Sequence, residues 1–219
     1  MFDAIARRYD FLNRVLSAGL DRSWRRRAIQ SLAIEGHETL LDLCTGTADV
    51  ALAATGARRT IGVDFAFEML RIGRGKIEDA QRTHIWLVRG DATSLPCATS
   101  SIDLATIAFG IRNVQDPARA LCEVARVMKP GGRLAILEFG EPRVPILRGL
   151  YRWYFRAVLP RIGALVSRHA NAYSYLPASV GAFPSPQAFC EQLRTAGFSD
   201  VQADPLTLGV VYLYRARRL

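Results

Sequence analysis

The 219-residue sequence predicts an α/β fold built on an open, largely parallel sheet. Short apolar runs alternate with stretches of helical periodicity between residues 37 and 140, which is the order expected of successive βα units. Several of these runs end in an acidic residue, as at Asp64, Asp91 and Glu138. Ligands bind outside the carboxyl ends of the strands in open α/β sheets, so these acids indicate a binding crevice at one edge.

The elements follow from local patterns, taken in chain order. Apolar residues recur every three to four positions over 2–20, which is typical of a helix. Asp21 can cap a second helix that continues to Leu32, and we expect Arg25 to Arg27 on its solvated face. A turn at 129–132 should precede the fifth strand. Strands are expected at 40–43, 60–64, 85–88, 102–108 and 133–138 and within 201–214, and helices at 50–54, 67–77, 117–128 and 186–196.

The first strand and its turn, Leu40 to Asp49, are the centre of the prediction. An apolar run passes into small residues that let the backbone turn sharply toward a helix. Such a turn brings backbone N–H groups and a helix N-terminus up to a ligand. A full dinucleotide fingerprint would have more glycines than Gly46, since Cys44 and Ala48 occupy other tight positions. Alone, this turn does not distinguish a ligand site from an ordinary βα connection.

The next two strand ends make a ligand site the better interpretation. The second strand ends in Asp64, about twenty residues further on, where a carboxylate can accept hydrogen bonds from both hydroxyls of a ribose. Gly90, Asp91 and Ala92 follow the third strand. The combination is more specific than any one of its parts.

These motifs resemble those of class I S-adenosylmethionine-dependent methyltransferases. The sequence is more similar still to one family, the C-methyltransferases of quinone biosynthesis, which methylate demethylmenaquinol and, in many bacteria, the ubiquinone precursor. The resemblance covers nearly the whole chain, with its motifs in the expected order. It is carried by Tyr9-Asp10-Phe11-Leu12-Asn13, Asp42 to Asp49, Phe109-Gly110-Ile111-Arg112-Asn113-Val114, Leu137-Glu138-Phe139 and Tyr175-Leu176-Pro177-Ala178-Ser179-Val180.

The sequence departs from the family pattern at four positions. Asp21 stands where the family usually has His, and Gly140 stands where Ser is common. Thr45 and Ala48 replace glycines. The last two replacements are tolerable if those backbones need not adopt a positive φ.

The resemblance implies a Rossmann-like, doubly wound class I methyltransferase sheet, mostly parallel with an antiparallel edge. It also implies a single domain over residues 1–219, with an N-terminal helical cap and a helical insertion. We assign the cap to 1–36, the cofactor-binding core to 37–140, the substrate- or membrane-facing insertion to 141–184, and the closing helix and strands to 185–219.

The function implied is transfer of a methyl group from S-adenosylmethionine to a ring carbon of a reduced prenylated quinone precursor. The turn from Cys44 to Asp49 looks more like menaquinone-pathway members, which favours demethylmenaquinol over the ubiquinol precursor. The resemblance places Gly46 and Thr47 at the methionine end of the cofactor and Asp64 at its ribose. It places residues 91–92 beside the adenine. The cofactor-binding residues implied are Asp42, Gly46, Thr47, Asp64, Asp91, Ala92 and Ala108, and no metal ligands are expected.

Two acids of the first βα unit keep alternative roles. Asp42 either orients the turn or meets the amino group of the cofactor. Asp49 either caps the following helix or faces the reaction centre. The sequence does not choose between these roles.

The chemistry of methyl transfer to a ring carbon defines two further roles in the site, a charge stabiliser and a proton acceptor. A quinone carbon is electron-poor, so the substrate should be the reduced quinol, and loss of a hydroxyl proton makes the neighbouring carbon more nucleophilic. The site must therefore stabilise oxyanion charge and accept a proton. We assign the first task to Arg112, because a guanidinium stays protonated. Tyr9, Asp49 or His169 is left to relay the proton.

The formal charge of +9 suits an anionic partner, such as nucleic acid, a membrane surface or an acidic substrate. Arg148, Arg152 and Arg156 fall at i, i+4 and i+8 in an aromatic-rich stretch, as in a basic helix on an anionic bilayer; a helix packed on its own domain is the alternative. Four scattered cysteines are expected to be small buried hydrophobes in a reducing cytosol. We therefore expect a cytoplasmic enzyme with a lipid-soluble quinol substrate, peripheral contact with the inner face of the cell membrane, and no nucleic-acid partner. A homo-oligomer is left open.

Three other functions compete with this one. An RNA methyltransferase would explain the charge, but the Asn-Pro-Pro-aromatic type of motif common in base methylation is absent after Ala108. A nicotinamide-dependent oxidoreductase would share the strand, turn and ribose acid, but should have Gly in place of Cys44 and Ala48. A non-catalytic module that retains the cofactor fold is the third.

Overall fold

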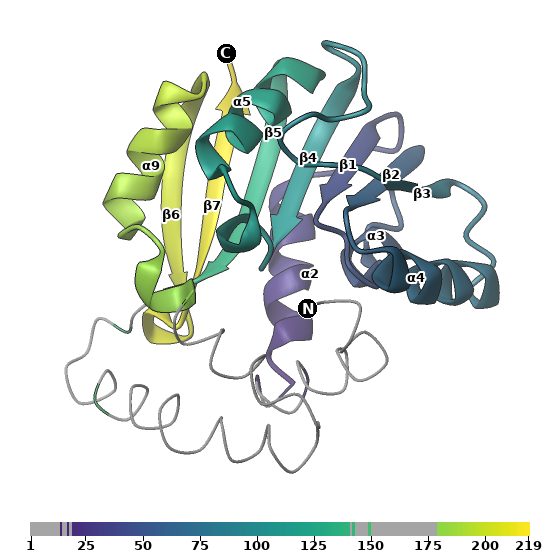
Figure 1. The fold of residues 1–219 in the computed structure, drawn as a ribbon, viewed down its shortest axis with the longest axis horizontal. Coiled ribbons are helices and arrows are strands. Elements are labelled where there is room, and N and C mark those ends of the chain that lie inside the picture. Colours follow the sequence, from purple (N-terminus) through teal and green to yellow (C-terminus); the bar gives the residue numbers. More distant parts are fainter. Residues whose placement is uncertain (1–13, 15–16, 18, 141, 143–148, 150–178) are drawn as a thin grey trace.

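The computed structural model describes residues 14, 17, 19–140, 142, 149 and 179–219 (Figure 1). They form one seven-stranded sheet in the order β3-β2-β1-β4-β5-β7-β6. The strands are β1 (Thr39–Leu43), β2 (Arg59–Asp64), β3 (Ile85–Arg89), β4 (Ile102–Ala108), β5 (Met128–Phe139), β6 (Phe198–Leu206) and β7 (Val211–Arg218). β1 to β5 are parallel, whereas β7 is antiparallel to both of its neighbours, β5 and β6. The predicted mostly parallel sheet with an antiparallel edge is confirmed.

Helices cover both faces of the sheet (Figure 1). One face packs on α5 (Pro117–Val127) and α9 (Pro186–Thr195), and the other on α2 (Asp21–Ser31), α3 (Asp49–Ala53) and α4 (Phe67–Asp79). Alternate strand residues are apolar on both faces, and β1, an inner strand, is buried throughout. This is the pattern expected of a doubly wound sheet.

Helix α2 is fixed to its face of the sheet by an aromatic cluster. Trp24 is 5% exposed and packs against Phe109 and Phe139 at ring-centroid distances of 6.0 Å and 6.5 Å. Its indole Nε1–H donates to Thr207 Oγ1 at 2.9 Å. A buried Trp with its N–H satisfied fixes the orientation of the helix that carries it.

Two details differ from the expectation. The turn expected at 129–132 lies inside β5 as a bulge, because β4 advances from Ile102 to Leu104 while β5 advances from Met128 to Arg133. Cys122 is exposed rather than buried, whereas Cys190 is buried as expected. Within the described ranges, no helix is both long enough and apolar enough to cross a bilayer.

The ends of β1 and β4 approach closely, and Gly110 makes this approach feasible. A Cβ at Gly110 would lie 2.3 Å from Cys44 Cβ, well inside van der Waals contact. The short η1 helix (Ile111–Asn113) then turns back over the carboxyl end of the sheet. A glycine is therefore required where the second loop of the candidate site passes the first.

Candidate active site

The turn after β1 has an unusual backbone, because alternate residues adopt a positive φ. Cys44, Gly46 and Ala48 have φ values of 56°, 55° and 66°. The left-handed conformation costs a residue with a Cβ roughly 1–2 kcal/mol, so only Gly46 adopts it freely. Ala48 thus has the positive φ that the glycine replacement was expected to avoid, whereas Thr45 does not. Ala48 is also the N-cap of α3, so the capping role considered for Asp49 is wrong.

Two carboxylates hold this turn. Asp42 is 1% exposed, and its Oδ2 accepts hydrogen bonds from Thr45 Oγ1 at 2.6 Å and from the backbone N of Ala51 at 3.1 Å. Asp64 Oδ2 accepts from the backbone N of Gly46 at 2.8 Å. The contacts of Asp42 therefore favour the loop-orienting alternative.

A cavity of about 630 Å³ opens at the carboxyl ends of β1, β2, β3 and β4. Of the seven predicted cofactor-binding residues, Asp42 and Thr47 are not among its lining residues, although Thr47 belongs to the same turn. The five that line it are Gly46, Asp64, Asp91, Ala92 and Ala108. Its size lies in the range of small-molecule sites.

Asp91 presents an ionised carboxylate at the rim of the cavity. It is exposed, and Oδ1 accepts hydrogen bonds from both the backbone N and Oγ1 of Thr93 at 2.8 Å. These two bonds lower the pKa of Asp91 below its ordinary value. Ala92 beside it is buried, so the acid and a small apolar surface lie side by side.

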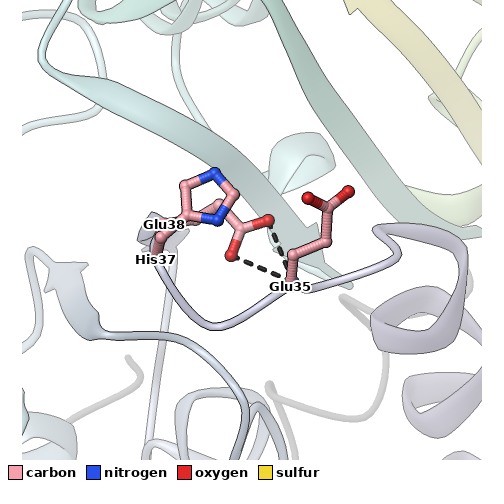
Figure 2. Close-up of side chains that lie close together, drawn as sticks. All are labelled: Glu35, His37 and Glu38. Carbon is pink, nitrogen blue, oxygen red and sulfur yellow. Dashed lines mark hydrogen bonds between the residues drawn. The ribbon is translucent and has the colours of Figure 1, made fainter.

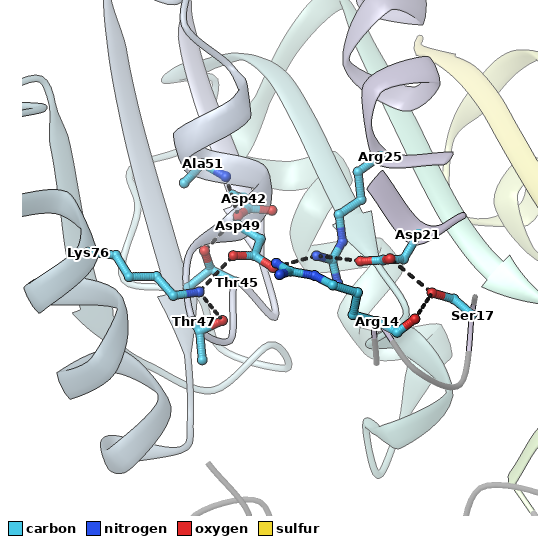
Figure 3. A network of polar contacts seen from close by, with 10 residues as sticks. All are labelled: Arg14, Ser17, Asp21, Arg25, Asp42, Thr45, Thr47, Asp49, Ala51 and Lys76. Atoms are coloured by element: carbon cyan, nitrogen blue, oxygen red, sulfur yellow. Dashed lines mark hydrogen bonds and ion pairs between the residues drawn. The ribbon is translucent and has the colours of Figure 1, made fainter. Parts of the chain in front are cut away.

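Thr47 and Asp49 belong to a polar network beneath the turn (Figure 3). Asp49 lies 2.6 Å from Arg25 Nη1 on α2 and 2.7 Å from Lys76 Nζ on α4, and Lys76 also donates to Thr47 Oγ1 at 3.0 Å. Burial would raise the pKa of Asp49, but Lys76 and Arg25 outweigh it and lower the pKa. Asp49 does not line the cavity, and its catalytic role stays a prediction.

The expectation that Arg25 lies on the solvated face of α2 is wrong. Its side chain is only 11% exposed, so it does not lie on the solvated face of α2. Its neighbours Arg26 and Arg27 are exposed as expected. The helical pattern of the sequence could not show that Arg25 differs from Arg26 and Arg27, because its partner Asp49 lies on another helix, α3.

Arg112 is paired with a buried acid. Its Nη1 lies 2.6 Å from Glu138 Oε1 and donates to the carbonyl of Phe109 at 2.7 Å. The side chains of Arg112 and Glu138 are 8% and 0% exposed, and the guanidinium stacks over Phe139 at 5.3 Å. Arg112 Nε is buried without a hydrogen-bond partner among the described residues. The pair holds the guanidinium rigidly, but Arg112 is not a lining residue of the described cavity.

Lys76 and Glu138 are functional candidates that the sequence did not single out. For Glu138, the available signal is its place next to the end of β5. Lys76 gave no local signal, because its contacts run from α4 to a turn 27 residues earlier. Tyr9, His169 and the arginine stripe at 148, 152 and 156 lie outside the described residues.

Glu35, His37 and Glu38 are close enough to hold a metal ion (Figure 2), but their contacts indicate a structural role. Glu38 accepts hydrogen bonds from the backbone N of Glu35 and of Gly36 at 2.9–3.0 Å. Arg133 Nη2 lies 2.8 Å from Glu38 Oε1 and supplies the counter-charge. The cluster therefore closes the loop before β1.

The charges of the cavity fit a cationic nucleoside better than a dinucleotide. Among the described residues, three carboxylates line it, those of Asp64, Asp91 and Asp116, against one cation, Arg119. A pyrophosphate would be repelled by these acids, whereas ribose hydroxyls, an exocyclic amine and a sulfonium are suited to them. The lining residues therefore fit S-adenosylmethionine, and they argue against a nicotinamide-dependent oxidoreductase.

The sheet order, the acids at the strand ends and the cavity define a class I S-adenosylmethionine-dependent methyltransferase. A solved SAM-dependent methyltransferase from Thermotoga maritima shares the fold, with a TM-score of 0.67 at 19% identity over 100% of both chains. A model of the ubiE/COQ5 methyltransferase family matches residues 1–218, and the chain belongs to that family.

Two relatives show how close the chain is to known members. A protein of Syntrophotalea carbinolica named ubiquinone/menaquinone biosynthesis C-methyltransferase UbiE is 49% identical, over 100% of this chain and 92% of its own length. A demethylmenaquinone methyltransferase of Thermus thermophilus is 46% identical, over 98% of each chain. The predicted family, enzyme class and cofactor, S-adenosylmethionine, are confirmed. The roles of individual residues stay predictions.

The buried Asp42 gives a testable pH dependence. Burial raises its pKa from 3.8 to about 7, against the opposing effect of its two hydrogen bonds. The folded protein therefore keeps a proton that the unfolded chain loses, so this group lowers the free energy of unfolding as the pH rises from about 4 to about 7. Asp42→Asn cannot ionise, and its amide oxygen can accept both bonds.

We expect the free energy of unfolding of Asp42→Asn, relative to the wild type, to rise with pH by about 1.4 kcal/mol per unit in that window and to level off above it. Urea unfolding of both proteins between pH 4 and pH 8 measures the difference. Parallel profiles for the two proteins would contradict a raised pKa at Asp42.

Proposed function

We propose that this enzyme methylates a ring carbon of demethylmenaquinol, with S-adenosylmethionine as the methyl donor. The observation that carries the proposal is the cavity at the strand ends, in a chain whose relatives over its full length are named quinone C-methyltransferases. The same chemistry on the ubiquinol precursor is the second candidate, because the Syntrophotalea relative is named for both pathways.

The chain's own residues divide the task of holding the cofactor. Asp64 is suited to the ribose hydroxyls, because it ends β2 on the wall of the cavity and the backbone N–H groups of Ala66 and Gly46 orient its carboxylate there. Asp91 and Ala92 are suited to the adenine amine and ring. Asp42 acts through the turn that carries Gly46. When bound, S-adenosylmethionine supplies a methyl group activated by its sulfonium.

Thr47 and Ala108 complete the proposed binding site. Ala108 ends β4 and lines the cavity, so its small side chain leaves space next to the reacting groups. Thr47 is 2% exposed, and its hydroxyl accepts a hydrogen bond from Lys76. We propose that Thr47 supports the methionine end through the backbone of the turn rather than through its hydroxyl.

Arg112 is proposed to stabilise the oxyanion that develops on the quinol ring. The ion pair with Glu138 fixes its orientation, and a guanidinium is a permanent cation, which suits a charge stabiliser and not a base. Its Nε is buried without a hydrogen-bond partner among the described residues, so a substrate oxygen or a water would reach it only after a local rearrangement. Tyr9, Asp49 and His169 remain the proposed candidates for the proton relay.

The direct test is incubation of purified protein with labelled S-adenosylmethionine and each reduced quinone precursor. We expect demethylmenaquinol to give a labelled product heavier by one CH₂ group. The oxidised quinone should not react, because its ring carbon is electron-poor. Labelling of RNA but of neither quinol would contradict the proposal.

Arg112 can be tested without leaving a buried acid unpaired. Removing Arg112 alone would leave the buried Glu138 carboxylate unpaired and lower the free energy of unfolding by about 3–5 kcal/mol. The informative variant is therefore Arg112→Gln/Glu138→Gln. We expect kcat to fall about 100- to 1,000-fold while the Kd of the cofactor stays within about twofold. Glu138→Gln alone is the control: it keeps the guanidinium but loses the ion pair that orients it, so its kcat should fall less than that of the double variant. Wild-type kcat in the double variant would exclude Arg112 from the chemistry.

We also propose that the enzyme works in the cytoplasm, in contact with the inner face of the cell membrane. The lipid-soluble substrate and the charge of +9 support this. Arg22 and Arg26 lie one turn apart on α2, are exposed, and have no acidic partner among the described residues, and Leu20 beside them is 42% exposed. This combination suits an anionic bilayer.

The contact is testable by co-sedimentation with vesicles that contain anionic lipid. Arg22→Gln/Arg26→Gln should weaken binding by roughly 30-fold, from about 1 kcal/mol for each arginine. Arg71→Gln/Arg74→Gln removes the same charge from arginines that are already paired with Glu68 and Glu78, and it should bind nearly as the wild type does. Equal losses in both variants would place the contact elsewhere.

A further inference from the structure

A chain of charges links α2 to the turn after β1 (Figure 3). Asp21 begins α2, accepts a hydrogen bond from Ser17 at 2.9 Å and lies 3.5 Å from Arg25. Arg25 reaches Asp49 at 2.6 Å, and Asp49 reaches Lys76 at 2.7 Å. The link therefore runs from α2 to α4 through two acids and two bases in alternation.

The turn needs such a link, because its backbone is not the one its residues prefer. Cys44 and Ala48 hold positive φ values although each has a Cβ. Residues in this conformation persist only where the surrounding structure over-determines it. Ala48 immediately precedes Asp49, so the contacts of the Asp49 carboxylate act next to the strained residue.

Stabilisation of the fold alone does not readily explain why Arg25 is paired with Asp49. The side chain of Arg25 is 11% exposed and that of Asp49 is 34% exposed, and Arg25 Nε has no hydrogen-bond partner within the described part of the chain. A partly buried ion pair with an unsatisfied donor brings little net stability, because the desolvation penalty offsets much of the attraction. The aromatic contacts of Trp24 already fix α2 on the sheet.

We propose that Arg25 is a positioning residue: through Asp49 it holds the turn 44–48 in the left-handed form that binds S-adenosylmethionine. The proposal rests on the proposed cofactor site. Without the clamp, the turn samples other conformations and only a fraction of molecules is competent to bind. The apparent Kd rises by the inverse of that fraction, whereas the bound enzyme has the turn in place again.

The proposal therefore predicts a split between affinity and turnover. Arg25→Gln should raise the Kd for S-adenosylmethionine about tenfold and leave kcat at saturating cofactor within about twofold. Arg25→Lys keeps one cationic donor and should show an intermediate Kd. Calorimetric titration with S-adenosylmethionine measures the Kd without any quinol, and kcat is measured with demethylmenaquinol.

A double-mutant cycle separates the proposed role from a general loss of structure. Glycine adopts a positive φ without strain, so in an Ala48→Gly background the clamp has less to hold. Arg25→Gln should then raise the Kd only about two- to threefold. Asp49→Asn, which weakens both ion pairs of the turn, should match Arg25→Gln or exceed it. Arg74→Gln on the exposed face of α4 is the matched control and should keep the wild-type Kd.

The outcomes are distinct. A wild-type Kd in folded Arg25→Gln and Asp49→Asn would overturn the proposal. The same tenfold loss with and without Ala48→Gly would also overturn it, since the effect would then not act through the turn. If the wild type itself bound no S-adenosylmethionine, the proposed function would fail instead.

Discussion

The left-handed turn between β1 and α3 is the constraint on which the rest of the site depends. Two non-glycine residues in it, Cys44 and Ala48, adopt a conformation that costs each of them free energy. The turn persists because contacts from four other places converge on it: the Asp42 carboxylate, the Asp64 carboxylate, Lys76 and Arg25. Binding geometry is thus set by tertiary contacts rather than by glycine content.

The electrostatics of the site follow from how each acid is surrounded. Asp49 has two cations beside it, so it is ionised despite its burial, whereas Asp42 has only neutral donors in contact and its pKa is raised to about 7. Asp91 is ionised at an exposed rim. Acids only a few residues apart in the sequence therefore have different charge states and different tasks. The cavity keeps a negative character that suits a sulfonium-bearing nucleoside.

The sequence was sufficient for the strands of the parallel core and for the strand-end acids of the cavity wall, because both depend on local patterns. A strand that ends in Asp64 or in Asp91 puts its acid at the crevice wherever the sheet is parallel. The conformation of Ala48 and the burial of Arg25 could not be predicted in this way. Each is decided by partners from other elements, and no local pattern encodes them. The family resemblance supplied the antiparallel edge, which periodicity alone did not.

The aromatic cluster on α2 has a practical consequence for watching the enzyme at work. The indole of Trp24 is buried 6.0 Å from the ring of Phe109, and Phe109 is one of the residues that line the cavity. The second described tryptophan, Trp86, is 47% exposed on β3, so the two fluorophores emit from environments of different polarity. The protein thus carries an intrinsic optical reporter next to its cavity, and filling of that cavity can be followed by light emission without any attached dye.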